Sequence, residues 1–124
     1  MYVVQENIRL LNACEDLQNG NLSSLGRKMF ETHDGLSNDY EVSCKELDLL
    51  IQLVKNNNNV LGARMMGGGF GGCTINLVKE NNIEQLIADV GESYYRQMGT
   101  ECSHYIVAVA NGTSVIKASS AVLR

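Results

Sequence analysis

The feature that most constrains the fold of this chain is a run of glycines between two short segments of alternating character. Five of the six residues at positions 67–72 are glycine, and the sixth is Phe70. Residues 61–65 and residues 73–77 both alternate in side-chain type, which predicts two strands joined by the glycine run. A hairpin turn needs only one or two glycines. Five glycines leave a whole surface without side chains, so a ligand or another backbone can approach closely.

Several known glycine motifs share part of this pattern, but their contexts differ. Gly67, Gly69 and Gly72 satisfy GxGxxG, yet a dinucleotide site needs a helix after the glycines, and here a strand is expected. The P-loop of nucleotide triphosphatases needs Lys and Ser or Thr next, whereas Cys73 and Thr74 follow. The segments that accompany a protein-kinase glycine loop are missing. A plain tight hairpin remains an open alternative.

Apolar residues at helical spacing predict two helices before the hairpin. The first has Val4, Ile8 and Leu11 on one face and ends near Gly20. The second runs from about residue 22 to residue 32, with Asn21 as its N-cap. Residues 33–43 are rich in turn formers and are expected to be a loop.

The remainder of the chain predicts a small α+β unit. Ser43 and Glu46 fit a capping box, which would start a third helix that ends at the asparagine run of residues 56–59. After the hairpin, a fourth helix and a third strand at about residues 105–109 are expected. The chain therefore divides into a helical lead-in and loop, 1–43, and an α-β-β-α-β unit, 44–118. This order is a ferredoxin-like split β-α-β layer without its first strand, an antiparallel-rich sheet with helices on one face.

Composition restricts the classes of partner. The chain has 124 residues, a formal charge of −4 and no cluster of Lys or Arg, which argues against nucleic-acid and anionic-membrane surfaces. We expect no metal site, because the four cysteines are widely spaced, and we expect them to be reduced and to fill core space. Since the start of the chain lacks the pattern of a signal peptide, we expect a cytoplasmic protein.

Few side chains offer acid–base chemistry. His33 and Asp34, with Asp39 and Glu41, could form an acid–base set, but a solvated loop is the preferred interpretation. Arg64 alternates outward on its strand and could reach phosphate, although pairing with an acidic neighbour is favoured.

Two long segments resemble one known family. Residues 62–74, GARMMGGGFGGCT, resemble the third signature motif of GHMP kinases in its galactokinase form. Residues 39–48, DYEVSCKELD, resemble the galactokinase segment usually written DYEVSCPELD, and residues 3–9 look like the helix that precedes it. Order and spacing agree from about residue 2 to about residue 110.

The resemblance implies the C-terminal part of a kinase that transfers the γ-phosphate of ATP to the C1 hydroxyl of galactose, with Mg²⁺ bridging phosphates. It implies that the catalytic residues lie in a larger N-terminal part, so no catalytic residue is assigned here and the fragment alone is expected to be inactive. The residues carried over as lying beside the nucleotide phosphates and the sugar are Gly67, Gly68, Gly69, Phe70, Gly71 and Gly72, with Arg64 and Met66 as secondary candidates. The absent first strand further implies that the fragment self-associates.

Two positions depart from the family pattern. Lys45 stands where Pro is usual, which a helix start tolerates. Met66 stands where Thr is usual, so a hydroxyl is lost that either touches ligand or belongs to a position that merely packs. Other readings stay open: a GHMP kinase for N-acetylgalactosamine, mevalonate or homoserine, a non-catalytic sugar sensor related to galactokinase, or an unrelated ligand-binding domain.

Overall fold

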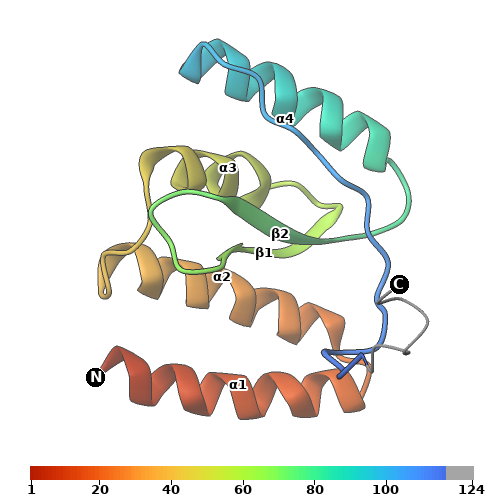
Figure 1. Ribbon diagram of the computed structural model, residues 1–124. Coiled ribbons are helices and arrows are strands. Elements are labelled where there is room, and N and C mark those ends of the chain that lie inside the picture. Colours follow the sequence, from red (N-terminus) through yellow and green to blue (C-terminus); the bar gives the residue numbers. More distant parts are fainter. Residues whose placement is uncertain (117–124) are drawn as a thin grey trace, which may run out of the picture.

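The computed structural model describes residues 1–116 as four helices and one hairpin. Helices α1 (Tyr2–Gln18) and α2 (Leu22–Asn38) come first, followed by α3 (Lys45–Lys55), strands β1 (Val60–Met66) and β2 (Cys73–Val78), and α4 (Ile83–Met98). In Figure 1, α1 and α2 lie on one side of the hairpin, and α3 and α4 lie on the other. No helix among these residues is long and apolar enough to cross a membrane.

Helices α1 and α2 form a pair joined mainly by polar contacts. The turn between them uses Gly20, whose φ of 68° is left-handed, and the Asn21 side chain accepts a hydrogen bond from the N–H of Ser24, as expected for an N-cap. Arg9 pairs with Glu31 across the two helices. No residue of α1 is buried, and its apolar residues Val4, Ile8 and Leu11 are exposed.

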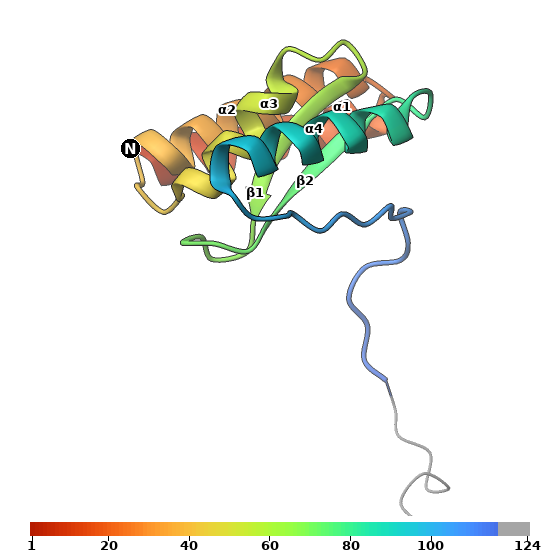
Figure 2. The same cartoon turned by 90° about the horizontal axis from the view of Figure 1, so that it is seen from above.

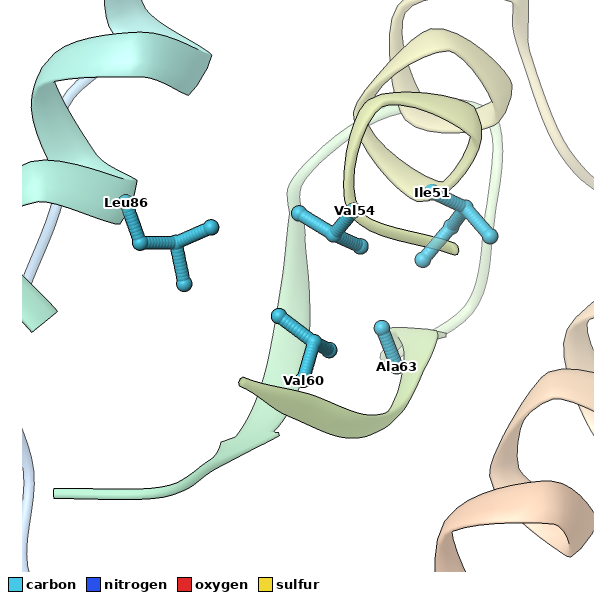
Figure 3. Packing of buried hydrophobic residues seen from close by; sticks show 5 residues of the cluster. All are labelled: Ile51, Val54, Val60, Ala63 and Leu86. Carbon is cyan, nitrogen blue, oxygen red and sulfur yellow. The ribbon is translucent and has the colours of Figure 1, made fainter. Parts of the chain in front are cut away.

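The core lies between the sheet and helices α3 and α4. It comprises Ile51 and Val54 of α3, Val60 and Ala63 of β1, and Leu86 of α4, as Figure 3 shows. β1 and β2 pair antiparallel, with Ala63 opposite Asn76 and Met65 opposite Thr74. The face of the sheet that carries Met66, Cys73 and Ile75 is exposed.

Helix α2 lies alongside β1 at very short range. A Cβ atom built on Gly26 would lie 1.9 Å from the carbonyl oxygen of Leu61, and one built on Gly62 would lie 2.3 Å from the Cα of Gly26. Farther along, the backbone N–H of Met65 donates to the ring of His33 on α2 rather than to β2. The helix therefore protects backbone groups of β1 that a neighbouring strand would otherwise pair.

Three local expectations are wrong. Helix α2 continues to Asn38 instead of ending near Thr32, so residues 33–38 are helical. Ser43 and Glu46 do not form a capping box, because Cys44 is the N-cap of α3 and the Ser43 hydroxyl donates to Asp48. Residues 105–109 form no strand.

In Figure 2 the chain that follows α4 turns away from the helices before the last described residues, and Tyr105, Val107 and Val109 are 83%, 76% and 104% exposed. An alternating pattern forms a strand only where a pairing partner is present, and within residues 1–116 the sheet has two strands. The last two residues of the expected 44–118 unit lie outside the described residues.

The four cysteines are all free, and they do not fill the core as expected. Cys14 and Cys73 are exposed, while Cys44 and Cys102 are partly exposed. Among residues 1–116, no group of His, Cys, Asp and Glu side chains could hold a metal ion.

Candidate functional site

The glycine loop is the turn of the β1–β2 hairpin, and it projects beyond the helices in Figure 2. Its backbone is left-handed at five positions: Gly67 (φ 82°), Gly69 (90°), Phe70 (60°), Gly71 (140°) and Gly72 (98°). Side chains rarely adopt these angles, which explains the glycines. The conformation of this turn therefore favours glycine at positions 67, 69, 71 and 72, whereas Gly68 has no positive φ angle.

Most of the loop is open to solvent. A Cβ atom on Gly67, Gly68 or Gly71 would meet no other atom within 4 Å. The Phe70 side chain is 75% exposed. The uncovered backbone N–H groups of such a turn are donors that suit phosphate oxygens. The loop is thus a surface that carries few side chains and is open to solvent.

One contact fixes the tip of the loop to the segment between α2 and α3. The N–H of Phe70 donates to the carbonyl oxygen of Val42 at 2.7 Å. At Gly69, a Cβ atom would lie 2.2 Å from that same oxygen. Glycine is therefore required at position 69 both by its φ angle and by the close approach of the Val42 backbone.

A polar cluster lies behind the loop and was not anticipated from the sequence. Asp48 of α3 accepts hydrogen bonds from Ser43 (2.6 Å) and Ser37 (3.0 Å), and its Oδ1 lies 3.0 Å from Nε2 of His33. His33 is 3% exposed, so it belongs to the interior and not to a solvated loop. Its partner is Asp48, not Asp34, and Asp34 pairs with Lys55 instead.

A signal for the burial of His33 was present in the sequence. Met29, His33 and Leu36 are spaced at i, i+4 and i+7, which places His33 on the apolar face of a helix. Gly35 and Ser37 are typical turn residues, so the sequence pattern alone predicts a loop here. In the structure Gly35 accommodates the ring of Tyr2, which would lie 2.3 Å from a Cβ atom there.

The two secondary candidates have different surroundings. Arg64 donates through Nε to the carbonyl oxygen of Met65, and within residues 1–116 it forms no ion pair, so the expected acidic partner is wrong. Met66 ends β1 next to the loop and is 45% exposed.

The ionisable groups with shifted pKa values are not on the glycine loop. A backbone N–H at the start of α3, helped by the Cys44 side chain, lowers the pKa of Glu46. The bond from Lys28 lowers the pKa of Asp16 on α1. The loop itself has no side chain that transfers protons. What it can contribute to a reaction is backbone hydrogen bonding and close packing.

Comparisons with known proteins agree with this geometry. The family described as GHMP kinases C terminal matches residues 13–96. The galactokinase of Clostridium acetobutylicum is 42% identical over 115 residues, which are 93% of this chain and 30% of that protein. The galactokinase of Bacillus subtilis is 35% identical over 116 residues, 94% of this chain and again 30% of the relative. The chain thus spans about a third of the length of these relatives.

Two solved structures are similar as well. The galactokinase of Lactococcus lactis, determined in complex with galactose, superposes with a TM-score of 0.81 at 39% identity, covering 84% of this chain and 27% of that one. The mevalonate kinase of L. major, in complex with R-mevalonate, gives a TM-score of 0.60 at 32% identity, covering 68% and 26%. With the family match, the hairpin and its glycine loop, these similarities show that the chain belongs to the GHMP kinase family and comprises its C-terminal domain.

Proposed function

We propose that this chain is the C-terminal domain of a galactokinase, which transfers the γ-phosphate of ATP to the C1 hydroxyl of D-galactose to give galactose 1-phosphate. The observation that carries the proposal is the accessible glycine loop, held by Val42 at the end of a hairpin. It occurs in a chain that is 35–42% identical to galactokinases over most of its length. The lower TM-score to the mevalonate kinase favours the galactose branch.

In this proposal the domain supplies one wall of the active site. The loop from Gly67 to Gly72, with Arg64 and Met66 beside it, would face the nucleotide phosphates and the sugar. Phosphoryl transfer depends mainly on positioning and on stabilisation of charge. The loop can contribute both through backbone N–H groups. The general base and the side chains that grip the sugar would come from the N-terminal part of the complete kinase.

Magnesium, which bridges the phosphates in this type of reaction, would be held mainly outside this domain. Mg²⁺ prefers carboxylate and phosphate oxygens, and the glycine loop carries no carboxylate side chain. The chain's own part is the phosphate-facing backbone.

The test is a coupled assay of the complete kinase with ATP and galactose, and with N-acetylgalactosamine and mevalonate in parallel. We expect turnover that depends on galactose, and none from the 124-residue chain alone. Preference for another of these substrates would assign the kinase to a different branch of the GHMP kinase family. Binding of galactose and ATP without turnover would favour the sugar-sensor alternative.

A further inference from the structure

The glycine loop is held at two points by one continuous set of hydrogen bonds. At its tip, Phe70 donates to Val42. The next residue, Ser43, donates to Asp48, and Asp48 lies against Nε2 of His33. The path then returns to the strand that enters the loop, because the N–H of Met65 donates to Nδ1 of His33 at 3.1 Å. Residues from α2, α3 and β1 thus form a closed circuit around the base of the loop.

The geometry fixes which ring nitrogen of His33 carries the proton. Nδ1 faces the backbone N–H of Met65, which can only donate, so Nδ1 must accept and must carry no hydrogen. Nε2 faces a carboxylate oxygen of Asp48 at 3.0 Å, so it carries the hydrogen and donates. Asp48 therefore selects the tautomer that lets His33 bind the strand.

Two residues with strained backbone conformations lie next to the contact between Phe70 and Val42. Glu41 and Phe70 hold positive φ angles of 54° and 60° without being glycine. One directly precedes Val42, and the other is the donor to Val42. Conformations of this kind persist when surrounding contacts determine them, and they cluster where a loop must be presented in one shape.

We propose that His33 is a positioning residue of the kinase: its Nδ1 atom anchors the end of β1 and so sets the position of the glycine loop relative to bound phosphate. The role in phosphate positioning rests on the proposed function, while the anchoring of the loop does not. His33 touches no substrate in this role. It acts through Met65, two residues before Gly67, while the contact of Nε2 with Asp48 holds the ring in place.

Two substitutions separate the two contacts of the ring. In His33→Asn, the side-chain oxygen takes the place of Nδ1 and still accepts from Met65, whereas the contact to Asp48 is lost. In His33→Gln, the side-chain amide reaches the place of Nε2 and still donates to Asp48, whereas the N–H of Met65 is left without an acceptor. Ser37→Ala is the matched control, because it removes a hydrogen bond of Asp48 that lies outside the circuit.

The first measurement is amide hydrogen exchange by NMR in the 124-residue chain. We expect the Met65 amide to exchange about tenfold faster in His33→Gln than in His33→Asn, which corresponds to the loss of one hydrogen bond. Ser37→Ala should behave like the wild type. Equal exchange rates in the Asn and Gln variants would overturn the proposal, since a residue needed only for packing would be damaged equally by both changes.

A second measurement needs no variant and covers the case in which one does not fold. Nitrogen-15 spectra of the wild-type ring report its tautomer directly. We expect the proton on Nε2 alone, and a proton on Nδ1 would contradict the anchoring of Met65.

The catalytic readout is kcat/KM for ATP in the complete kinase. We expect a loss of about tenfold in His33→Gln, with near wild-type values in His33→Asn and Ser37→Ala. If the wild-type protein shows no turnover while the exchange difference persists, the proposed function fails and the anchoring stands. If turnover is normal and the Asn and Gln variants are equal, the anchoring fails and the function stands.

Discussion

Single residues at the glycine loop carry both conformational and steric constraints. At Gly69 the φ angle of 90° excludes most side chains, and the oxygen of Val42 fills the space where a Cβ atom would lie. At Gly68 neither constraint applies: its φ is not positive, and a Cβ atom would meet no neighbour within 4 Å. Two adjacent glycines should therefore respond very differently to substitution.

Replacement of Gly69 by Val should lower kcat of the complete kinase by about 10²-fold, because it displaces the loop tip from Val42. The far-UV circular dichroism should change little, since the helices do not depend on this turn. Gly68→Ala, at a position with no positive φ angle and no neighbour around its Cβ, should lower kcat less than Gly69→Val. Steady-state kinetics with varied ATP make the measurement, and unchanged kcat and KM in Gly69→Val would leave the glycines a turn-forming role only.

Tyr2 has the one strongly displaced pKa in the described part of the chain. Burial, together with the neighbouring Glu6 carboxylate, raises its pKa from 10.0 to about 12. Its hydroxyl donates to the carbonyl oxygen of Thr32, and its ring stacks on Tyr40. The folded state disfavours the phenolate, so the raised pKa of Tyr2 contributes to the free energy of unfolding. This contribution is fully present below pH 10 and is lost as the pH rises toward 12.

An absorbance titration of tyrosinate checks this directly. The wild type should show a late step near pH 12 that Tyr2→Phe removes. Tyr105→Phe, which changes a side chain that is 83% exposed, should leave the late step in place. A late step that survives Tyr2→Phe would assign it to another tyrosine.

At the scale of secondary-structure elements, the decisive contact is the one between α2 and β1. The two backbones meet at Gly26 and Gly62, where neither element has space for a methyl group. This approach brings His33, about two turns farther along α2, within hydrogen-bonding distance of β1. The fit of helix to strand is thus a condition for the anchoring of the glycine loop.

Gly26→Ala should destabilise the chain by about 1–3 kcal/mol, because the new methyl group would meet the Leu61 carbonyl. Gly91 of α4 is a matched control, since it is also helical and has nothing within 4 Å of its Cβ position. Gly91→Ala should stabilise by about 0.5–1 kcal/mol through helix propensity alone. Urea unfolding of both variants measures the difference, and a destabilised Gly91→Ala or an unaffected Gly26→Ala would contradict the contact.

Local patterns predicted the elements better than the contacts between them. The hairpin and the helix that contains Ile51 were predicted because their apolar spacing and their turn residues agree. The predicted end of α2 was wrong because Gly35 and Ser37 are turn formers. Their helical conformation depends on contacts with Tyr2 and Asp48, which lie elsewhere in the sequence. The capping box was wrong for the same reason, since Ser43 donates to Asp48. The glycine loop was identified, but its anchor was not, because pairing between distant polar residues leaves no periodicity.

At the scale of the whole molecule, two of the surface regions that carry apolar residues lie outside the hairpin. One is the outer face of α1, with Val4, Ile8 and Leu11. The other is the extended segment with Tyr105 and Val107. Apolar surface of this extent commonly marks contact with another protein surface. Since the chain spans about a third of its relatives, we propose that the N-terminal part of the kinase covers these residues.

The 124-residue chain should therefore associate as its concentration rises. Val107→Lys should weaken this association, whereas Ser103→Lys adds the same charge without removing an apolar side chain and should have a smaller effect. Sedimentation velocity over a series of concentrations distinguishes them. A chain that remains monomeric at every concentration would show that these surfaces do not need a partner. In the complete kinase we expect Val107→Lys to have no effect on association.

The anchoring circuit also has a direction along the chain. His33, Val42 and Asp48, which hold the glycine loop, all precede it in the sequence. During synthesis, which proceeds at about 5–20 residues per second, these residues leave the ribosome before the loop does. An isolated hairpin closes within about 10 µs. The residues that hold the loop have therefore already left the ribosome when both strands become free to pair, so no later segment of the chain has to arrive before these contacts can form.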